Sequence, residues 1–282
     1  MDALPILRRE CHLTRAAAPD LFRRAWLPED PLRALLIVHG FAEHSGRYER
    51  LASWFARRRC AVFAFDQRGY GRSGGVRAYA RRFDDYLDDL AEVMENTREE
   101  CPERPLYLVG HDLGGLVCAL FLQERPDDLA GALLSGTPLP RRGGRTPLRA
   151  VYTGLIARMA PRLKLRAAWG LESLSQDPAI VSEILEDPLA EFGHATASLV
   201  AQSFRAMQRL HGEALQRPVL LLRGERDSLC DASASERFAR EAPLGQLRSY
   251  SGRGHEIFHE STREEVFADM LGWVGEREEV AA

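Results

Sequence analysis

The sequence lacks several features that mark particular classes of protein. Lysine is nearly missing: Lys164 is the only lysine among 38 basic residues, which we attribute to codon bias. These basic residues are balanced by 41 acidic ones, and a net charge of −3 gives no global attraction to nucleic acid. The five cysteines are scattered and form no C-x-x-C pair, so we expect neither a metal site nor a disulfide framework. This cysteine usage favours a reducing, cytoplasmic location.

Long apolar runs are also missing. The N-terminal segment has no apolar run of signal-peptide length, and no stretch of about 18 apolar residues could span a bilayer. We therefore expect a protein that is neither secreted nor membrane-spanning. Its 282 residues, 45% of them hydrophobic, suffice for one large α/β domain or two small ones.

Short apolar, β-favouring runs alternate with amphipathic segments along most of the chain. Residues 10–27 predict an opening antiparallel hairpin. Buried strands are predicted at 33–39, 60–65, 106–109, 129–135, 218–223 and 246–250, and helices at 48–58, 83–100, 116–122 and from Ser261 onward. This rhythm is typical of an α/β fold with a mostly parallel central sheet and helices on both faces.

The rhythm breaks in the middle of the chain, where a helical insertion is predicted. We expect a core formed by residues 1–138 and 214–282, and a helical cap, or lid, formed by 139–213. A helix starting at Thr146-Pro147 would carry an apolar face that includes Tyr152, and residues 141–166 hold eight basic residues and no acid. Such a helix is typical of a lid that touches an anionic membrane surface or attracts an anionic substrate. The alternative is a solvated cap helix whose apolar face only closes a pocket.

The segment Gly110-His111-Asp112-Leu113-Gly114 lies between a predicted strand and a predicted helix. It has the shape of the nucleophile elbow G-x-S-x-G, with Asp112 in the serine position. The elbow needs flanking glycines because the turn is sharp, and the helix N-terminus beside it favours an anion. The alternative is a plain strand-to-helix turn in which Asp112 caps the helix.

Two further loops follow predicted strands upstream of the elbow. The strand that ends at His39-Gly40 is placed for an oxyanion loop, with the N–H groups of Phe41 and Leu113 as donors. We expect His39 and His44 to be structural histidines that hold this loop. In the loop 66–75, Asp66 and an arginine of the same loop are predicted to form a bracing pair. The alternative, a phosphate-cradling loop, is disfavoured because the spacing G-x-x-x-x-G-K is missing.

Two residues near the C-terminal end complete a catalytic pattern. Asp227 follows the predicted strand 218–223, and His255 lies in a glycine-rich loop after the last predicted strand. The order nucleophile Asp112, acid Asp227, base His255 is that of the α/β-hydrolases. A chance glycine turn at Asp112 would not predict the other two residues.

The sequence resembles the monoacylglycerol lipase and lysophospholipase branch of the α/β-hydrolases over nearly its whole length. The matching segments are HGFAEHSGRYERL (39–51), FDQRGYGRSGG (65–75), GHDLGG (110–115), LSQDPAIVSEILEDPL (174–189), LLLRGERDSLCD (220–231) and YSGRGHEIFHE (250–260). The resemblance implies a hydrolase with a deep apolar pocket for a lipophilic small molecule, beneath a mobile cap that touches membranes. It also implies Phe41 and Leu113 as oxyanion donors, and no cofactor or metal.

One position departs from that branch, which has serine where this chain has Asp112. The elbow instead resembles that of epoxide hydrolases and dehalogenases, in which an aspartate attacks an sp³ carbon and forms an alkyl-enzyme ester. His255, oriented by Asp227, would then activate the water that hydrolyses this ester. Leu113, in place of the tryptophan common in dehalogenases, argues against that activity. An epoxide hydrolase also needs a lid acid, and Tyr152 is the one tyrosine of the predicted lid.

Four interpretations follow from the sequence. The first is an epoxide-hydrolase-like enzyme on a lipase-like scaffold. The second is a carboxylic ester hydrolase of the monoacylglycerol lipase or lysophospholipase type, in which Asp112 works through a mixed anhydride or as a base. The third is a catalytically silent lipid-binding homologue, which the retained Asp227 and His255 disfavour. The fourth is a laboratory replacement of serine by Asp112.

Overall fold

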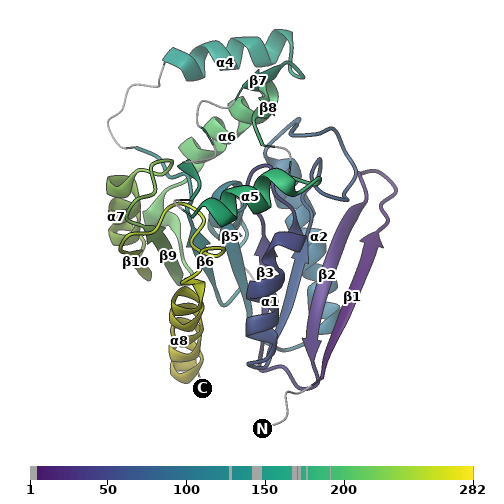
Figure 1. Ribbon diagram of the computed structural model, residues 1–282, viewed down its shortest axis with the longest axis vertical. Helices are drawn as coiled ribbons and strands as arrows, with labels where there is room; N and C mark the ends of the chain where they lie inside the picture. The colour runs from purple at the N-terminus through teal and green to yellow at the C-terminus, as the bar shows by residue number, and fades with distance from the viewer. Residues whose placement is uncertain are drawn as a thin grey trace.

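An eight-stranded sheet runs through the centre of the molecule in the computed structural model (Figure 1), which describes residues 5–126, 129–141, 148–166, 170, 173–175, 177–190 and 192–281. Its strand order is β1-β2-β4-β3-β5-β6-β9-β10. The pairs β1–β2 and β2–β4 are antiparallel, and all neighbouring pairs from β4 to β10 are parallel. The strands are β1 (Ile6–Leu13), β2 (Leu21–Pro28), β3 (Arg33–Val38), β4 (Cys60–Phe65), β5 (Leu106–His111), β6 (Gly131–Ser135), β9 (Val219–Gly224) and β10 (Gly245–Tyr250).

Helices cover both faces of this sheet, because alternate side chains of each central strand are apolar on both sides. On one face, Leu36 and Leu108 pack with α2 (Asp84–Glu100), α3 (Asp112–Glu124) and α7 (Ala232–Glu241). On the other face, Leu35 and Tyr107 pack with α1 (Glu49–Ala56) and α8 (Arg263–Ala281). The opening hairpin, the mostly parallel sheet and the two helical layers that the sequence predicts are confirmed.

The segments between β6 and β9 lie above the carboxyl ends of the strands (Figure 1). They comprise α4 (Leu148–Met159), β7 (Lys164–Arg166), α5 (Pro178–Glu186), β8 (His194–Thr196) and α6 (Ala197–Arg209), followed by the short 3-10 helix η3 (Gly212–Ala214). Strands β7 and β8 pair as a small antiparallel sheet that the sequence does not predict. The predicted helix start at 146–147 lies outside the described residues. None of the helices in the described part of the chain combines the length and apolar character that a bilayer crossing requires.

The predicted bracing ion pair between Asp66 and an arginine side chain of its own loop is wrong: the contact is the backbone N–H of Arg72, which donates to Asp66 Oδ2 at 2.7 Å. Asp66 instead accepts hydrogen bonds from the N–H and hydroxyl of Ser45, which opens the 3-10 helix η1 (Ser45–Tyr48). Arg68 reaches across to Asp89 on α2, with a 2.6 Å bond from Nε. Two neighbouring residues of one tight loop face different elements, which sequence spacing alone does not reveal.

Candidate active site

Asp112 occupies a strained turn between β5 and α3, as the elbow pattern predicts. Its φ is +46°, a left-handed conformation that costs about 1–3 kcal/mol for a residue other than glycine. The flanking glycine is required by close packing, since a Cβ on Gly114 would lie 2.1 Å from the carbonyl oxygen of Val38. The turn holds the half-buried Asp112 at the carboxyl end of the central strand and at the N-terminus of α3.

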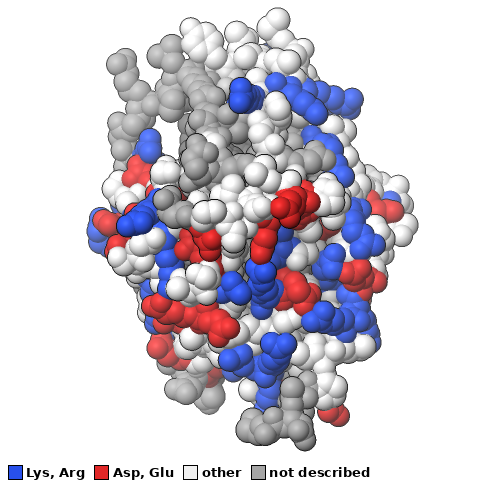
Figure 2. All heavy atoms as spheres, viewed as in Figure 1, with Lys and Arg blue, Asp and Glu red and all other residues white. Residues whose placement is uncertain are grey.

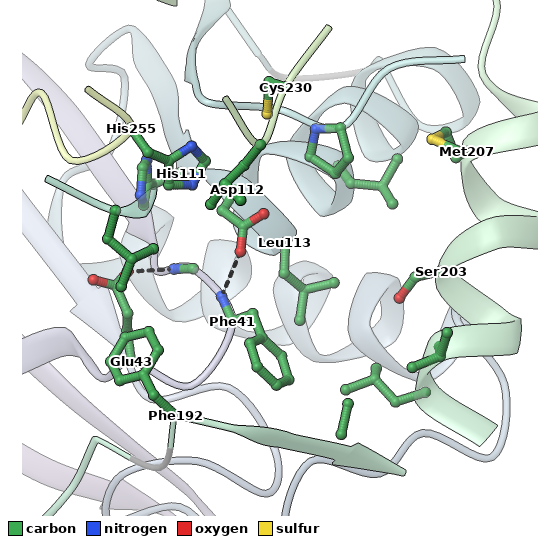
Figure 3. Close-up of a pocket in the computed structure, with 18 of the residues that line it drawn as sticks. Phe41, Glu43, His111, Asp112, Leu113, Phe192, Ser203, Met207, Cys230 and His255 are labelled. Carbon is green, nitrogen blue, oxygen red and sulfur yellow. Dashed lines mark hydrogen bonds between the residues drawn. The ribbon is translucent and has the colours of Figure 1, made fainter. Parts of the chain in front are cut away.

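The loop after β3 contacts the Asp112 carboxylate directly. The backbone N–H of Phe41 donates a 3.0 Å hydrogen bond to Asp112 Oδ2, so a predicted oxyanion donor holds the side chain in the nucleophile position (Figure 3). Leu113, the other predicted donor, follows Asp112 and lines the same cavity. The other carboxylate oxygen, Oδ1, is not the one that the Phe41 N–H contacts.

His255 and Asp227 form a buried pair, in the arrangement predicted for a base and its orienting acid. His255 Nδ1 lies 2.9 Å from Asp227 Oδ2, while Asp227 Oδ1 accepts the backbone N–H groups of Leu229 and Cys230. Although burial opposes ionisation, these hydrogen bonds lower the pKa of Asp227 below its ordinary value. Burial alone would lower the pKa of His255, but hydrogen bonds with Asp227 and Cys230 raise it well above 6.5.

A cavity of about 420 Å³ brings these residues together. Phe41, Asp112, Leu113 and His255 line it, and Figure 3 shows Asp112 between the two histidines His111 and His255 on one side and α6 on the other. Most of the remaining wall is apolar: Leu116, Leu165, Leu174, Phe192, Leu199, Val200, Phe204, Met207 and Leu229. Such a lining suits a lipophilic ligand.

Tyr152, the predicted lid acid, is not brought to this site. Its side chain is 61% exposed, and the residue of α4 that lines the cavity is its neighbour Thr153. Leu155 and Met159 are also exposed, so these apolar side chains of α4 point away from the cavity, which disfavours the alternative of a cap helix whose apolar face only closes a pocket. Other segments between β6 and β9, including Leu165 and Phe192, supply the apolar wall instead.

The two histidines of the oxyanion loop have structural contacts, as predicted. His39 is fully buried, and its Nε2 accepts the backbone N–H of Gln67 at 2.9 Å. His44 Nδ1 accepts the N–H of Gly46, while its Nε2 lies 2.7 Å from Asp187, at the end of α5. His44 therefore ties the oxyanion loop to the segment above it.

A buried polar cluster beside Asp112 and His255 was missed by sequence reasoning. Glu43, Arg47, His111 and Glu256 are joined by ion pairs, and Glu43, His111 and Glu256 also line the cavity. Their positions in the sequence could have revealed these residues. Glu256 follows His255, His111 precedes Asp112, and Glu43 lies in the His-Gly-x-x-Glu motif.

Potential metal-ligand groups among the described residues overlap with these same contacts. One group combines Asp227, Cys230 and His255, whose ligand atoms lie within 4.8 Å of one another. In that group His255 Nδ1 and Asp227 Oδ2 are already within hydrogen-bond distance of each other, at 2.9 Å.

Comparison with known proteins places this chain among hydrolases. Residues 29–262 match the family described as serine aminopeptidase, S33. The chain is 31% identical to the monoglyceride lipase of Homo sapiens, across 94% of this chain and 90% of that protein. It is 28% identical to the monoacylglycerol lipase of Mycolicibacterium smegmatis, across 88% and 90%.

Solved structures agree with this assignment. The crystal structure of Paleococcus ferrophilus monoacylglycerol lipase superposes with a TM-score of 0.81 at 28% identity, covering 91% of this chain and 99% of that chain. A soluble variant of monoglyceride lipase from Saccharomyces cerevisiae, in complex with a substrate analogue, shares the fold with a TM-score of 0.85 at 21% identity, covering 98% of each chain. The chain therefore belongs to the serine aminopeptidase S33 family of α/β-hydrolase enzymes, with monoglyceride lipases among its homologues.

Proposed function

We propose that the protein hydrolyses a lipophilic substrate with Asp112 as nucleophile, His255 as proton-transfer group and Asp227 as its orienting acid. One observation carries this proposal: the Phe41 N–H holds Asp112 Oδ2, and Asp112 lines the same largely apolar cavity as His255, whose Nδ1 is held by Asp227. A carboxylate held in this way can attack a saturated carbon and then present its own carboxyl carbon to water.

For an epoxide the steps balance without a tyrosine. Asp112 Oδ1 attacks one ring carbon, the ring C–O bond breaks, and protonated His255 gives its proton to the released oxygen. Neutral His255 then takes a proton from water, which attacks the carboxyl carbon of Asp112, while the Phe41 and Leu113 N–H groups stabilise the oxyanion. The ester C–O bond of this intermediate then breaks, and protonated His255 gives its proton to the leaving alkoxide, which releases the diol. The proton left on the Asp112 carboxyl group passes to His255, so the carboxylate and the protonated imidazole are both restored. The raised pKa of His255 supports its role as the initial acid.

A second candidate is carboxylic ester hydrolysis of the monoacylglycerol lipase or lysophospholipase type. It is supported by the homologues and by the cavity itself, whose apolar wall meets a polar end formed by Glu43, His111 and Glu256. No tyrosine lines the cavity in the described part of the chain, which removes the phenol expected of an epoxide hydrolase. In this alternative, Asp112 would act through a mixed anhydride or as a base for water.

We further propose that residues 139–213 form a cap that touches a lipid surface. The exposed side chains of Tyr152, Leu155 and Met159 give α4 an apolar outer face. Exposed cations flank it, and the surface around α4 and β7 is blue and white in Figure 2. These cations are Arg158, Arg162, Lys164 and Arg166; Arg142 and Arg145 lie outside the described residues. Apolar residues framed by cations suit an anionic membrane interface.

A turnover panel tests the reaction. The purified protein would be given lipophilic terminal and aryl epoxides, medium-chain monoacylglycerols and 4-nitrophenyl esters, beside the variants Asp112→Asn, Asp112→Ser and His255→Gln. We expect diol from an epoxide, lost in Asp112→Asn and Asp112→Ser, and an alkyl-enzyme adduct on Asp112 that accumulates in His255→Gln and is seen as added mass.

Other outcomes would decide between the alternatives. Ester hydrolysis by the wild type, lost in Asp112→Asn, would establish the second candidate. Activity only in Asp112→Ser would identify a lipase scaffold silenced at one side chain.

A further inference from the structure

One buried network contacts the chain neighbours of Phe41, Asp112 and His255. Phe41 follows Gly40, Asp112 follows His111, and His255 precedes Glu256. Gly40, His111 and Glu256 are joined to one another through two further residues, Glu43 and Arg47. The side chains of these two are 1% and 7% exposed.

Glu43 fixes the oxyanion loop from within. Its Oε2 accepts the backbone N–H of Gly40 at 2.8 Å and the hydroxyl of Tyr48 at 2.9 Å, while Oε1 accepts Arg47 Nε at 2.7 Å. The held Gly40 N–H lies one residue before the Phe41 N–H that donates to Asp112 (Figure 3). The orientation of that donor therefore depends on the position of the Glu43 carboxylate.

Arg47 extends the network to the other two segments. Its Nη2 lies 3.3 Å from Glu256 Oε2, and Glu256 Oε1 lies 3.4 Å from His111 Nε2. The His111 and His255 rings are then in contact, with centroids 4.7 Å apart. A single guanidinium thus joins the loop after β3 to the loop that carries His255.

The charges of the network balance when His111 is protonated. Glu43 and Glu256 supply two negative charges, Arg47 one positive charge and His111 the other. Burial alone would lower the pKa of His111, but Glu256 raises it above the ordinary value. His259, which faces both carboxylates, stays neutral because burial and Arg47 lower its pKa to about 4. A neutral network is what a buried site tolerates, and loss of one member leaves an uncompensated charge.

We propose that Glu43 and Arg47 are positioning residues, which hold the Phe41 N–H on the nucleophile and lock the His255 loop in register with it. The role rests on the proposed function only in taking residue 112 as the nucleophile. It predicts that weakening the network lowers the rate of the chemical step more than it changes KM, because Glu43 lies at the polar end of the cavity and the apolar wall that would hold a lipophilic chain is untouched.

The test uses Glu43→Gln and Arg47→Lys, each made in the wild type and in Asp112→Ser. Glu100→Gln is the matched control, because Glu100 forms a 2.8 Å ion pair with the buried Arg23 on β2, outside the cavity lining. Turnover of 4-nitrophenyl butyrate by the serine forms would give kcat and KM, and hydrogen–deuterium exchange would report on residues 39–44 in every form.

We expect kcat to fall by about 10–100-fold in Glu43→Gln, with KM changed less than about twofold, since loss of one oxyanion donor costs about 100–1,000-fold. Exchange at 39–44 should quicken in Glu43→Gln and Arg47→Lys, with β9 unchanged, and Glu100→Gln should alter neither property. Unchanged exchange at 39–44 in both variants would overturn the proposal, as would a kcat in Glu43→Gln within about twofold of its parent.

The exchange arm needs no turnover, so it decides the proposal even if no form is active. If Glu43→Gln lost protection from exchange throughout the chain, the variant would be unfolded. The proposal would then be decided by exchange at 39–44 in Arg47→Lys, which keeps the charge. Failure of the proposed function would appear differently, as a wild type that turns over nothing while the effects on exchange remain.

Discussion

At the residue scale, the decisive feature is a carboxylate where the family resemblance calls for a hydroxyl. The Asp112 side chain already accepts the Phe41 N–H, so the donor expected to stabilise a developing charge is satisfied before any substrate arrives. In the proposed epoxide mechanism this changes the order of events: the oxyanion contact serves the nucleophile first and the intermediate afterwards. His255 would then deliver a proton and take one back, which would tie the reaction to its protonation state.

The pH dependence separates the two candidate reactions. Epoxide opening needs protonated His255, so its kcat/KM should fall as pH rises through the raised pKa, with a midpoint above 6.5. For ester hydrolysis with neutral His255 as the base, kcat/KM should instead rise over the same pH range. The pair's contribution to stability is fully present between the ordinary pKa values of the two groups, 3.8 and 6.5. It is lost as pH rises through the raised pKa of His255, and also as pH falls through the lowered pKa of Asp227.

The variant Asp227→Asn tests whether Asp227 causes this fall in kcat/KM with rising pH, measured as a pH–rate profile. It removes the anion that holds the proton, so the midpoint should move to lower pH and kcat should drop by about 10³–10⁴-fold. Asp88→Asn, which alters a half-exposed carboxylate on α2, is the control and should leave the profile unchanged. A midpoint that stays in place in Asp227→Asn would contradict the assignment.

At the element scale, most of the core was predictable and most of the region above it was not. The strand β3 and the elbow were readable because a short apolar run followed by glycine is a local signal. The direction of α4 was not readable: its apolar stripe is clear in the sequence, but whether it faces the cavity or solvent depends on neighbours far away in the chain. The pairing of β7 with β8 joins segments about 30 residues apart and leaves no periodic trace.

The outward face of α4 predicts binding to anionic vesicles. Met159 is 80% exposed, and burying such a side chain in the acyl boundary contributes about 1.5–3 kcal/mol. Met159→Asp should therefore weaken co-sedimentation with phosphatidylglycerol-containing vesicles by about tenfold or more. Leu244→Asp replaces an exposed apolar residue outside the cap and should bind as the wild type does. Equal binding by both variants would exclude α4 as the contact.

At the scale of the whole molecule, a buried ion network ties the first hairpin to one helical layer. Asp89 on α2 is fully buried between Arg15, which follows β1, and Arg68 in the loop after β4. This contact holds the antiparallel edge of the sheet against the layer that also carries α3. The network lies apart from the cavity, so its loss should affect stability before catalysis.

Asp89→Ala should cost about 3–5 kcal/mol in the free energy of unfolding, because two arginines lose a buried partner. Urea titration followed by circular dichroism would measure it. Asp30→Ala removes an exposed partner of Arg59, 63% accessible in its side chain, and should cost about 0–1 kcal/mol. A loss of similar size in the two variants would show that the buried network is not what holds the hairpin.

The contact between Asp112 and the Phe41 N–H has a consequence for how such proteins are found. Some reagents reveal hydrolases in a proteome by reacting with a serine hydroxyl. They phosphonylate it and place the phosphonyl oxygen against the backbone N–H donors. Here the elbow offers no hydroxyl, and an anion already occupies the donor. A survey of that kind would pass over this chain although it keeps the architecture of the family, and its substrates would have to be sought by watching products form.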